Sequence, residues 1–149
     1  MSDRTSLTTR LHDILAAEVA AVSGVLEILG REGAALLERD ASGLLAISNS
    51  KAEAVARAAS LEKQRQALLQ EHPDLSGARM TAALEQLREL ALACRQQNEA
   101  NGLMIRGQRR RIEGALNILR GGRPGVDIYG RDGAATQLVR PSREPLASY

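Results

Sequence analysis

Residues 80–119 read MTAALEQLRELALACRQQNEANGLMIRGQRRRIEGALNIL, and this stretch decides the fold. Alternating steps of four and three residues pick out a heptad seam in which nine positions are apolar and three are polar, as expected of a helix that packs lengthwise against other helices. Forty residues of helix extend about 60 Å at ~1.5 Å per residue, so partners of comparable length are needed. The twelve seam positions are Met80, Leu84, Leu87, Ala91, Cys94, Asn98, Asn101, Ile105, Gln108, Ile112, Ala115 and Leu119.

Two upstream segments with helical periodicity supply those partners. We expect helices over about 6–37 and 43–71, separated by the turn-forming run Asp-Ala-Ser-Gly at 40–43. The run His-Pro-Asp-Leu-Ser-Gly at 72–77 separates the second helix from a third over 78–119. Short connections place neighbouring helices antiparallel. The predicted fold is therefore all-α, an elongated antiparallel three-helix bundle or coiled-coil hairpin over 1–119, with a bend or fraying near the glycines at 30–33.

The last thirty residues have a different composition. Gly and Pro make up eight of residues 120–149, five Gly and three Pro, a level typical of disordered segments. The charge surplus of the chain lies there as well, because five Arg face three acidic residues in this range. We expect a flexible C-terminal tail over 120–149.

Composition excludes several classes of function. One Cys and two distant His disfavour a metal centre, and no grouping of carboxylate, His and nucleophile predicts an enzyme or a cofactor site. A formal charge of only +2 argues against a nucleic-acid binder, and no apolar run approaches the ~20 residues that a membrane span needs. The remaining expectation is a reduced, cytoplasmic helical protein with no membrane insertion.

Asn98 and Asn101 are polar residues on the predicted seam. A buried amide needs hydrogen-bond partners, and one polar seam residue disfavours slipped pairings, so a register role is the first interpretation. The second is a polar notch in a groove that recognises a partner helix. Cys94, on the same seam, is interpreted as a small buried hydrophobe, since no base is predicted near it for a nucleophilic role.

Two further features are open to more than one interpretation. Arg106 and Arg109–Arg111 form the densest basic cluster, which suits a solvated helix end better than nucleic-acid binding without stacking aromatics. In the tail, Ile128 and Tyr129 are flanked by turn formers, which is typical of a short linear motif that orders on binding. Packing of Tyr129 onto the bundle is the equal alternative.

In its third helix and tail the chain resembles the FlgN family of bacterial flagellar export chaperones. The stretch from Cys94 to Ile105, continued through Gln108 to Leu119, resembles the Asn-Gly element of the family and the helix end after it. The run Ile-Tyr-Gly-Arg-Asp-Gly at 128–133 is similar to the Tyr-Gly-x-x-Gly tail element. A weaker similarity, Lys…Leu-Glu…Arg, begins at Lys51.

The resemblance implies a chaperone that holds the C-terminal helices of hook–filament junction proteins, prevents premature assembly and delivers its clients to the type III export gate. Ile128, Tyr129, Gly130 and Gly133 are the positions implied for docking at the gate. For the client we select six residues of the third helix, the last four of them because the end of this helix lies next to the tail. They are Asn98, Asn101, Ile105, Ile112, Leu116 and Leu119.

A different class of function also fits the heptad pattern. The chain could be a structural coiled-coil adaptor, or a homo-oligomer subunit whose seam is buried between copies. Sedimentation distinguishes the two, because a concentration-independent dimer or tetramer favours the structural role.

Overall fold

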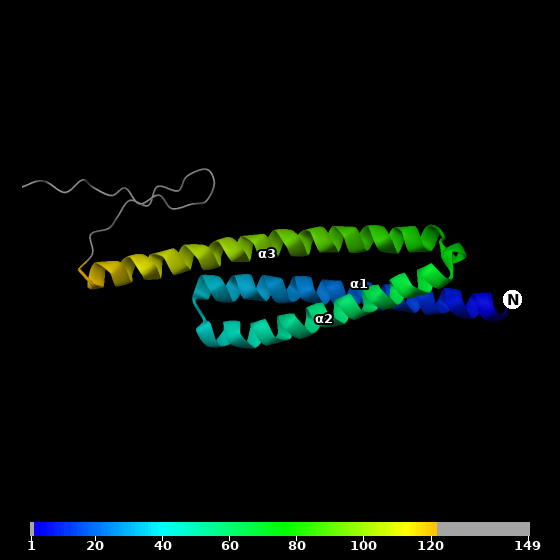
Figure 1. Ribbon diagram of the computed structural model, residues 1–149, viewed down its shortest axis with the longest axis horizontal. Helices are drawn as coiled ribbons and strands as arrows, with labels where there is room; N and C mark the ends of the chain where they lie inside the picture. The colour runs from blue at the N-terminus through cyan, green and yellow to red at the C-terminus, as the bar shows by residue number, and fades with distance from the viewer. Residues whose placement is uncertain (1, 122–149) are drawn as a thin grey trace, which may run out of the picture. The chain divides into compact units, whose positions relative to one another are not determined.

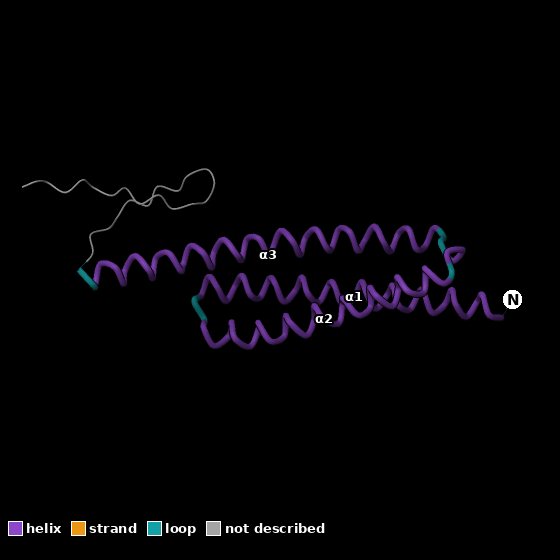
Figure 2. Tube along the Cα trace, viewed as in Figure 1, coloured by secondary structure: helices purple, strands orange, loops and turns teal. Residues whose placement is uncertain are grey.

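The computed structural model describes residues 2–121, and all of its elements are helical (Figures 1 and 2). The order along the chain is α1 (Ser2–Glu38), α2 (Ala41–Glu71), the short 3-10 helix η1 (Pro73–Leu75) and α3 (Ala78–Leu119). The chain divides into two compact units, Met1–Arg109 and Arg110–Tyr149. Within the first unit, α1 and α2 form an antiparallel hairpin and α3 runs in the direction of α1 (Figure 1). The fold is the predicted all-α helical bundle.

The turn between α1 and α2 is closed by local hydrogen bonds. Arg39 adopts a positive φ of 57°, its N–H donates to the carbonyl of Leu36 at 3.3 Å, and the N–H of Asp40 donates to the carbonyl of Ala35 at 3.0 Å. This is the Schellman pattern that ends many helices. The Asp40 carboxylate then accepts the Gly43 N–H at 3.0 Å and caps α2. Asp40 therefore takes part in closing the end of α1 through its N–H and caps the start of α2 through its carboxylate.

At the other end of the hairpin, His72 ends α2 and Pro73 begins η1. Proline is compatible with this position because the first turn of a helix leaves its N–H without an intrahelical acceptor. Gly77 precedes α3, and its carbonyl accepts the Thr81 N–H at 3.1 Å.

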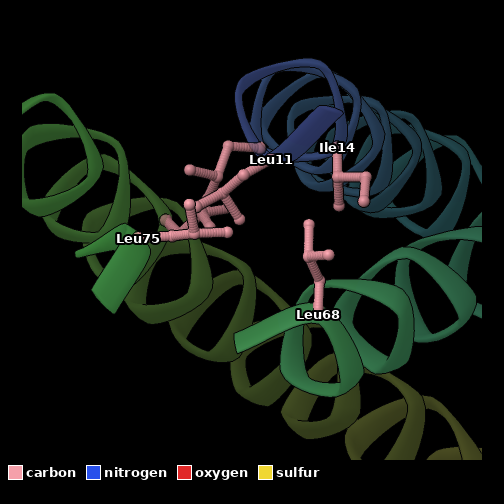
Figure 3. Packing of buried hydrophobic residues seen from close by; sticks show 6 residues of the cluster. Leu11, Ile14, Leu68 and Leu75 are labelled. Atoms are coloured by element: carbon pink, nitrogen blue, oxygen red, sulfur yellow. The ribbon is translucent and has the colours of Figure 1, made fainter. Parts of the chain in front are cut away.

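An apolar cluster holds the three helices together next to η1. Its buried members come from α1, α2, η1 and α3, and Figure 3 shows Ile14 directed toward Leu68 and Leu11 beside Leu75. The Leu75 side chain therefore anchors the connection between α2 and α3. The six buried residues are Leu11, Ile14, Leu15, Leu68, Leu75 and Leu87.

α1 continues as one helix through residues 30–33 to Glu38, so the helix does not fray at these glycines. Gly33 is instead a contact residue. A Cβ built there would lie 2.9 Å from Asn101 Oδ1 and 3.1 Å from Gln97 Nε2, whereas one at Gly30 would meet nothing within 4 Å. Gly33 thus leaves room for the amide side chains of Gln97 and Asn101 against α1, which outweighs the weaker helix propensity of glycine.

Candidate partner-binding site

Asn101 is the centre of a polar network and is only 1% exposed. Its Nδ2 donates to the Leu29 carbonyl at 2.9 Å and to Glu32 Oε2 at 2.8 Å, while its Oδ1 accepts from Gln97 Nε2 at 3.0 Å. Its amide is therefore bonded at both ends, and removal of any partner would leave a buried polar group unsatisfied.

Lys51 of α2 joins the same network from the second helix of the hairpin. Its Nζ lies 3.1 Å from Glu32 Oε2 and 3.2 Å from Oε1, and it also donates to Asn98 Oδ1 at 3.1 Å. The network links all three helices, and we call it the polar node. Its members are Glu32, Lys51, Gln97, Asn98 and Asn101.

Side chains of α3 also contact main-chain carbonyls of α1 at heptad intervals. Cys94 Sγ lies 3.8 Å from the Val22 carbonyl, and Gln108 Nε2 lies 2.7 Å from the carbonyl of Leu36. With the bond from Asn101 to Leu29, the three pairs share one offset, since 94 − 22, 101 − 29 and 108 − 36 all equal 72. The constant offset fixes a parallel register of α3 on α1.

A second buried ion pair fixes α1 against α2. Glu18 is 4% exposed and accepts from Arg65 Nε at 2.7 Å and from Nη2 at 3.2 Å. The residue numbers of this pair add to 83, as do those of Glu32 and Lys51, so both ion pairs belong to one antiparallel register. The structure thus places a basic partner beside each of the two glutamates.

These contacts bear directly on two predicted client residues. Asn101 is buried and fully engaged inside the bundle, and Asn98 is exposed but bonded to Lys51. The geometry matches the register interpretation of the two amides. Cys94 is half-buried beside the Val22 carbonyl, and desolvation by burial raises the pKa of its thiol. A raised pKa lowers the thiolate fraction at neutral pH and so lowers nucleophilicity.

The remaining client positions carry exposed apolar side chains. Ile105 is 48% exposed, Ile112 61%, Leu116 43% and Leu119 83%. At ~100° per residue these four positions share one face of α3, whereas Leu103 lies about 180° from Ile112. The prediction that the α3 seam is buried along its whole length is therefore wrong for these four positions.

A groove of about 810 Å³ lies between α1 and the start of α3. Its wall is largely apolar and includes Leu15, Val19 and Met80, and the charged or titratable side chains among its lining residues are His12 and Arg79. Short side chains such as Ala83 leave room there for an approaching helix. No sequence motif indicates this groove, because it arises from the separation of two helices.

Other predicted features fall outside the described residues or are only partly described. Ile128, Tyr129, Gly130 and Gly133 lie beyond residue 121, as does the rest of the predicted tail. Over residues 2–121 no cluster of three His, Cys, Asp or Glu side chains is arranged to hold a metal ion. In that same part of the chain, no helix combines the length and apolar character that crossing a membrane requires.

Comparison with known proteins identifies one family. A family model described as FlgN protein matches residues 1–137, which includes the hairpin, the polar node, α3 and the tail motif. Neither the curated proteins nor the solved structures contain a significant match to this chain.

Proposed function

Because the chain belongs to the FlgN family, we propose that this flagellar export chaperone binds the C-terminal helical segments of hook–filament junction proteins in the cytoplasm. It keeps those segments from assembling prematurely and delivers its clients to the type III export gate. Beyond the family match, the observation that carries the proposal is the exposed apolar face near the end of α3, since a soluble helix seldom leaves such a face without a partner.

The client contact follows from the chemistry of that face. An amphipathic client helix lays its own apolar stripe against Ile105, Ile112, Leu116 and Leu119, the mode of helix recognition that uses anchors three, four or seven residues apart. A segment that orders only on binding loses conformational entropy, which keeps the affinity moderate. Moderate affinity suits a carrier that must release its client. Asn98 and Asn101, the other two predicted client residues, are bonded within the polar node.

The gate contact is proposed for the tail. Ile128 and Tyr129, with Gly130 and Gly133 allowing tight turns, form a short motif in which one aromatic and one aliphatic anchor carry most of the affinity. The composition of the preceding residues, Gly-Gly-Arg-Pro-Gly at 121–125, suits a linker that lets the motif act separately from the client face.

The client contact is tested by alanine substitution on two faces of α3. Replacing Ile112 or Leu116 by Ala removes part of an apolar anchor, and we expect client affinity to fall about 5- to 30-fold, the worth of roughly 1–2 kcal/mol of lost burial. Leu103→Ala is the matched control, because Leu103 is 63% exposed on the opposite face. Titration calorimetry with a peptide of the client C-terminal helix measures the difference.

The result distinguishes two locations for the client. Equal losses at Leu103 and Ile112 would contradict an oriented contact on α3. If Ala83→Glu, which places a charge in the groove between α1 and α3, abolishes binding while Ile112→Ala does not, the groove is the client site. No client binding by the wild-type chain would contradict the chaperone function itself.

The gate contact is tested with the only two tyrosines of the chain. We expect Tyr129→Ala to weaken binding to purified export-gate protein and to leave client affinity unchanged, because the two contacts use separate residues. Tyr149→Ala controls for loss of an aromatic residue in the same region. Normal docking by the Tyr129 variant would contradict the assignment.

The structural coiled-coil role is the second candidate, favoured by the same exposed seam. In that case Ile112 and Leu119 would pack against a second copy. Sedimentation equilibrium of the wild-type chain and of Ile112→Ala decides between the two. A dimer that dissociates in the variant supports the structural role, and a monomer in both supports the chaperone.

A further inference from the structure

The two halves of α3 within the first unit are attached to the hairpin by different chemistry. Near its start, Leu87 is buried in the apolar cluster, with Met80, Ala83 and Leu84 packed against it. After Leu87, the one side chain of α3 that the structure describes as buried is Asn101. From Cys94 to Gln108 the attachment therefore consists mainly of hydrogen bonds from polar side chains.

Those hydrogen bonds differ from apolar burial in what happens when they break. An amide that leaves its partner in the bundle bonds to water instead. Each such bond therefore shifts the equilibrium between the attached and the detached state by only about 2- to 12-fold. Three of the contacts are made to carbonyls of α1, those of Val22, Leu29 and Leu36. When α3 leaves, the first two keep their intrahelical bonds and the Leu36 carbonyl keeps the bond from the Arg39 N–H.

The hairpin beneath this segment has attachments of its own. Glu32 stays paired with Lys51, and Glu18 with Arg65, so departure of α3 leaves neither carboxylate without a cation. By the register in which residue numbers add to 83, the buried Leu36 lies level with the buried Ile47 of α2. The α1–α2 pair therefore does not depend on α3 for its charges or for all of its apolar packing.

We propose that residues 94–108 of α3 form a latched arm, held closed on the α1–α2 hairpin by the polar node and opening from it while the hairpin and the apolar cluster near η1 stay folded. The latch closes because Gly33 lets the amides of Gln97 and Asn101 reach α1. The inference rests on contacts within the first unit and does not require the proposed chaperone function.

Gly33 provides the perturbation, and Gly30 provides its matched control. A methyl group at residue 33 would lie 2.9 Å from Asn101 Oδ1 and 3.1 Å from Gln97 Nε2, whereas one at residue 30 has open space. Both substitutions to Ala raise the helix propensity of α1 by the same amount. We therefore expect Gly33→Ala to raise the ratio of open to closed arm at least 2- to 12-fold, the worth of one amide bond, and Gly30→Ala to leave it unchanged.

Spin-label distance measurements on the full chain report the arm and the hairpin separately. In a Cys94→Ser background, which keeps a donor toward Val22, one pair of labels is attached to Ala34→Cys and Ala100→Cys, across α1 and α3. A second pair uses Ala34→Cys and Ala52→Cys, across α1 and α2. All three alanines are exposed, so the labels do not disturb the bundle interior.

The expected result is a second, longer population between residues 34 and 100 in Gly33→Ala, with an unchanged distance between residues 34 and 52. Asn101→Ala, which removes the central amide without adding a methyl group to α1, should give the same outcome. The proposal is overturned if both distances broaden together, since the arm then opens only when the hairpin unfolds. It is equally overturned if neither variant changes the distance between residues 34 and 100.

Discussion

Replacing Arg65 by Met should destabilise the bundle strongly, because it leaves the Glu18 carboxylate buried without its cation. The pair is bidentate, at 2.7 and 3.2 Å, and the two side chains are only 15% and 6% exposed. Breaking a buried pair from one side costs about 3–5 kcal/mol. We take the lower end, about 3 kcal/mol, because Arg65 retains some contact with water.

That free energy converts to a shift in melting temperature. The structure describes 120 residues, from 2 to 121, and unfolding entropy is about 2.1 cal/mol/K per residue, so the total is roughly 0.25 kcal/mol/K. A loss of about 3 kcal/mol then lowers Tm by about 12 °C. Urea unfolding monitored by helical circular dichroism gives the free energy, and a thermal scan gives Tm.

Two variants separate the buried charge from general effects of the substitution. Arg88→Met removes an exposed partner of Glu85 in a pair that is 77% and 62% exposed, and it should change stability by less than about 0.5 kcal/mol. The double variant Glu18→Leu with Arg65→Met removes both charges and should recover most of the loss. The reasoning is refuted if Arg65→Met costs no more than Arg88→Met, or if the double variant is less stable than Arg65→Met alone.

Three smaller perturbations test the helix ends and the thiol. Arg39→Gly should raise the free energy of unfolding by about 0.5–1 kcal/mol, because glycine adopts a φ of 57° without steric cost, and an unchanged urea midpoint would contradict this. Asp40→Ala should lower it by about 1 kcal/mol through loss of the α2 cap, while Asp40→Asn should retain most of the cap, and equal losses would contradict the capping role. Burial raises the pKa of the Cys94 thiol, so the pH midpoint of its alkylation should lie higher in the folded chain than in concentrated urea, and an equal or lower midpoint would count against this.

The helices were predictable because each has its own hydrophobic periodicity and is bounded by turn-forming or helix-breaking residues. The turn-forming run at 40–43 marked the break between the first two helices, and Pro73 marked the break after the second. The family followed from local motifs as well, since the Asn-Gly element after Cys94 lies within one helix. Features of this kind need no knowledge of how helices pair.

The buried charges could not be assigned from single segments. Glu18 and Glu32 lie on the seam of α1, where a carboxylate is unfavourable unless a cation faces it. Their partners are 47 and 19 residues away, and only the antiparallel register brings them together. The useful signal was the spacing itself: two glutamates 14 residues apart in one helix match Lys51 and Arg65, also 14 apart in the next.

Register likewise explains the level of the bundle at which the polar node lies. A slip of α3 by one heptad on α1 would keep most apolar seam residues facing apolar neighbours, so hydrophobic burial alone discriminates weakly between registers. The same slip would move Asn101 from the level of Leu29 to that of Val22 or Leu36, leave Glu32 without its amide donor and carry the Gln97 and Asn101 pair away from Gly33. Each lost bond would leave a buried polar group unsatisfied, at about 1–3 kcal/mol apiece. The few polar residues of the seam therefore specify the alignment of α3 on α1 within the first unit.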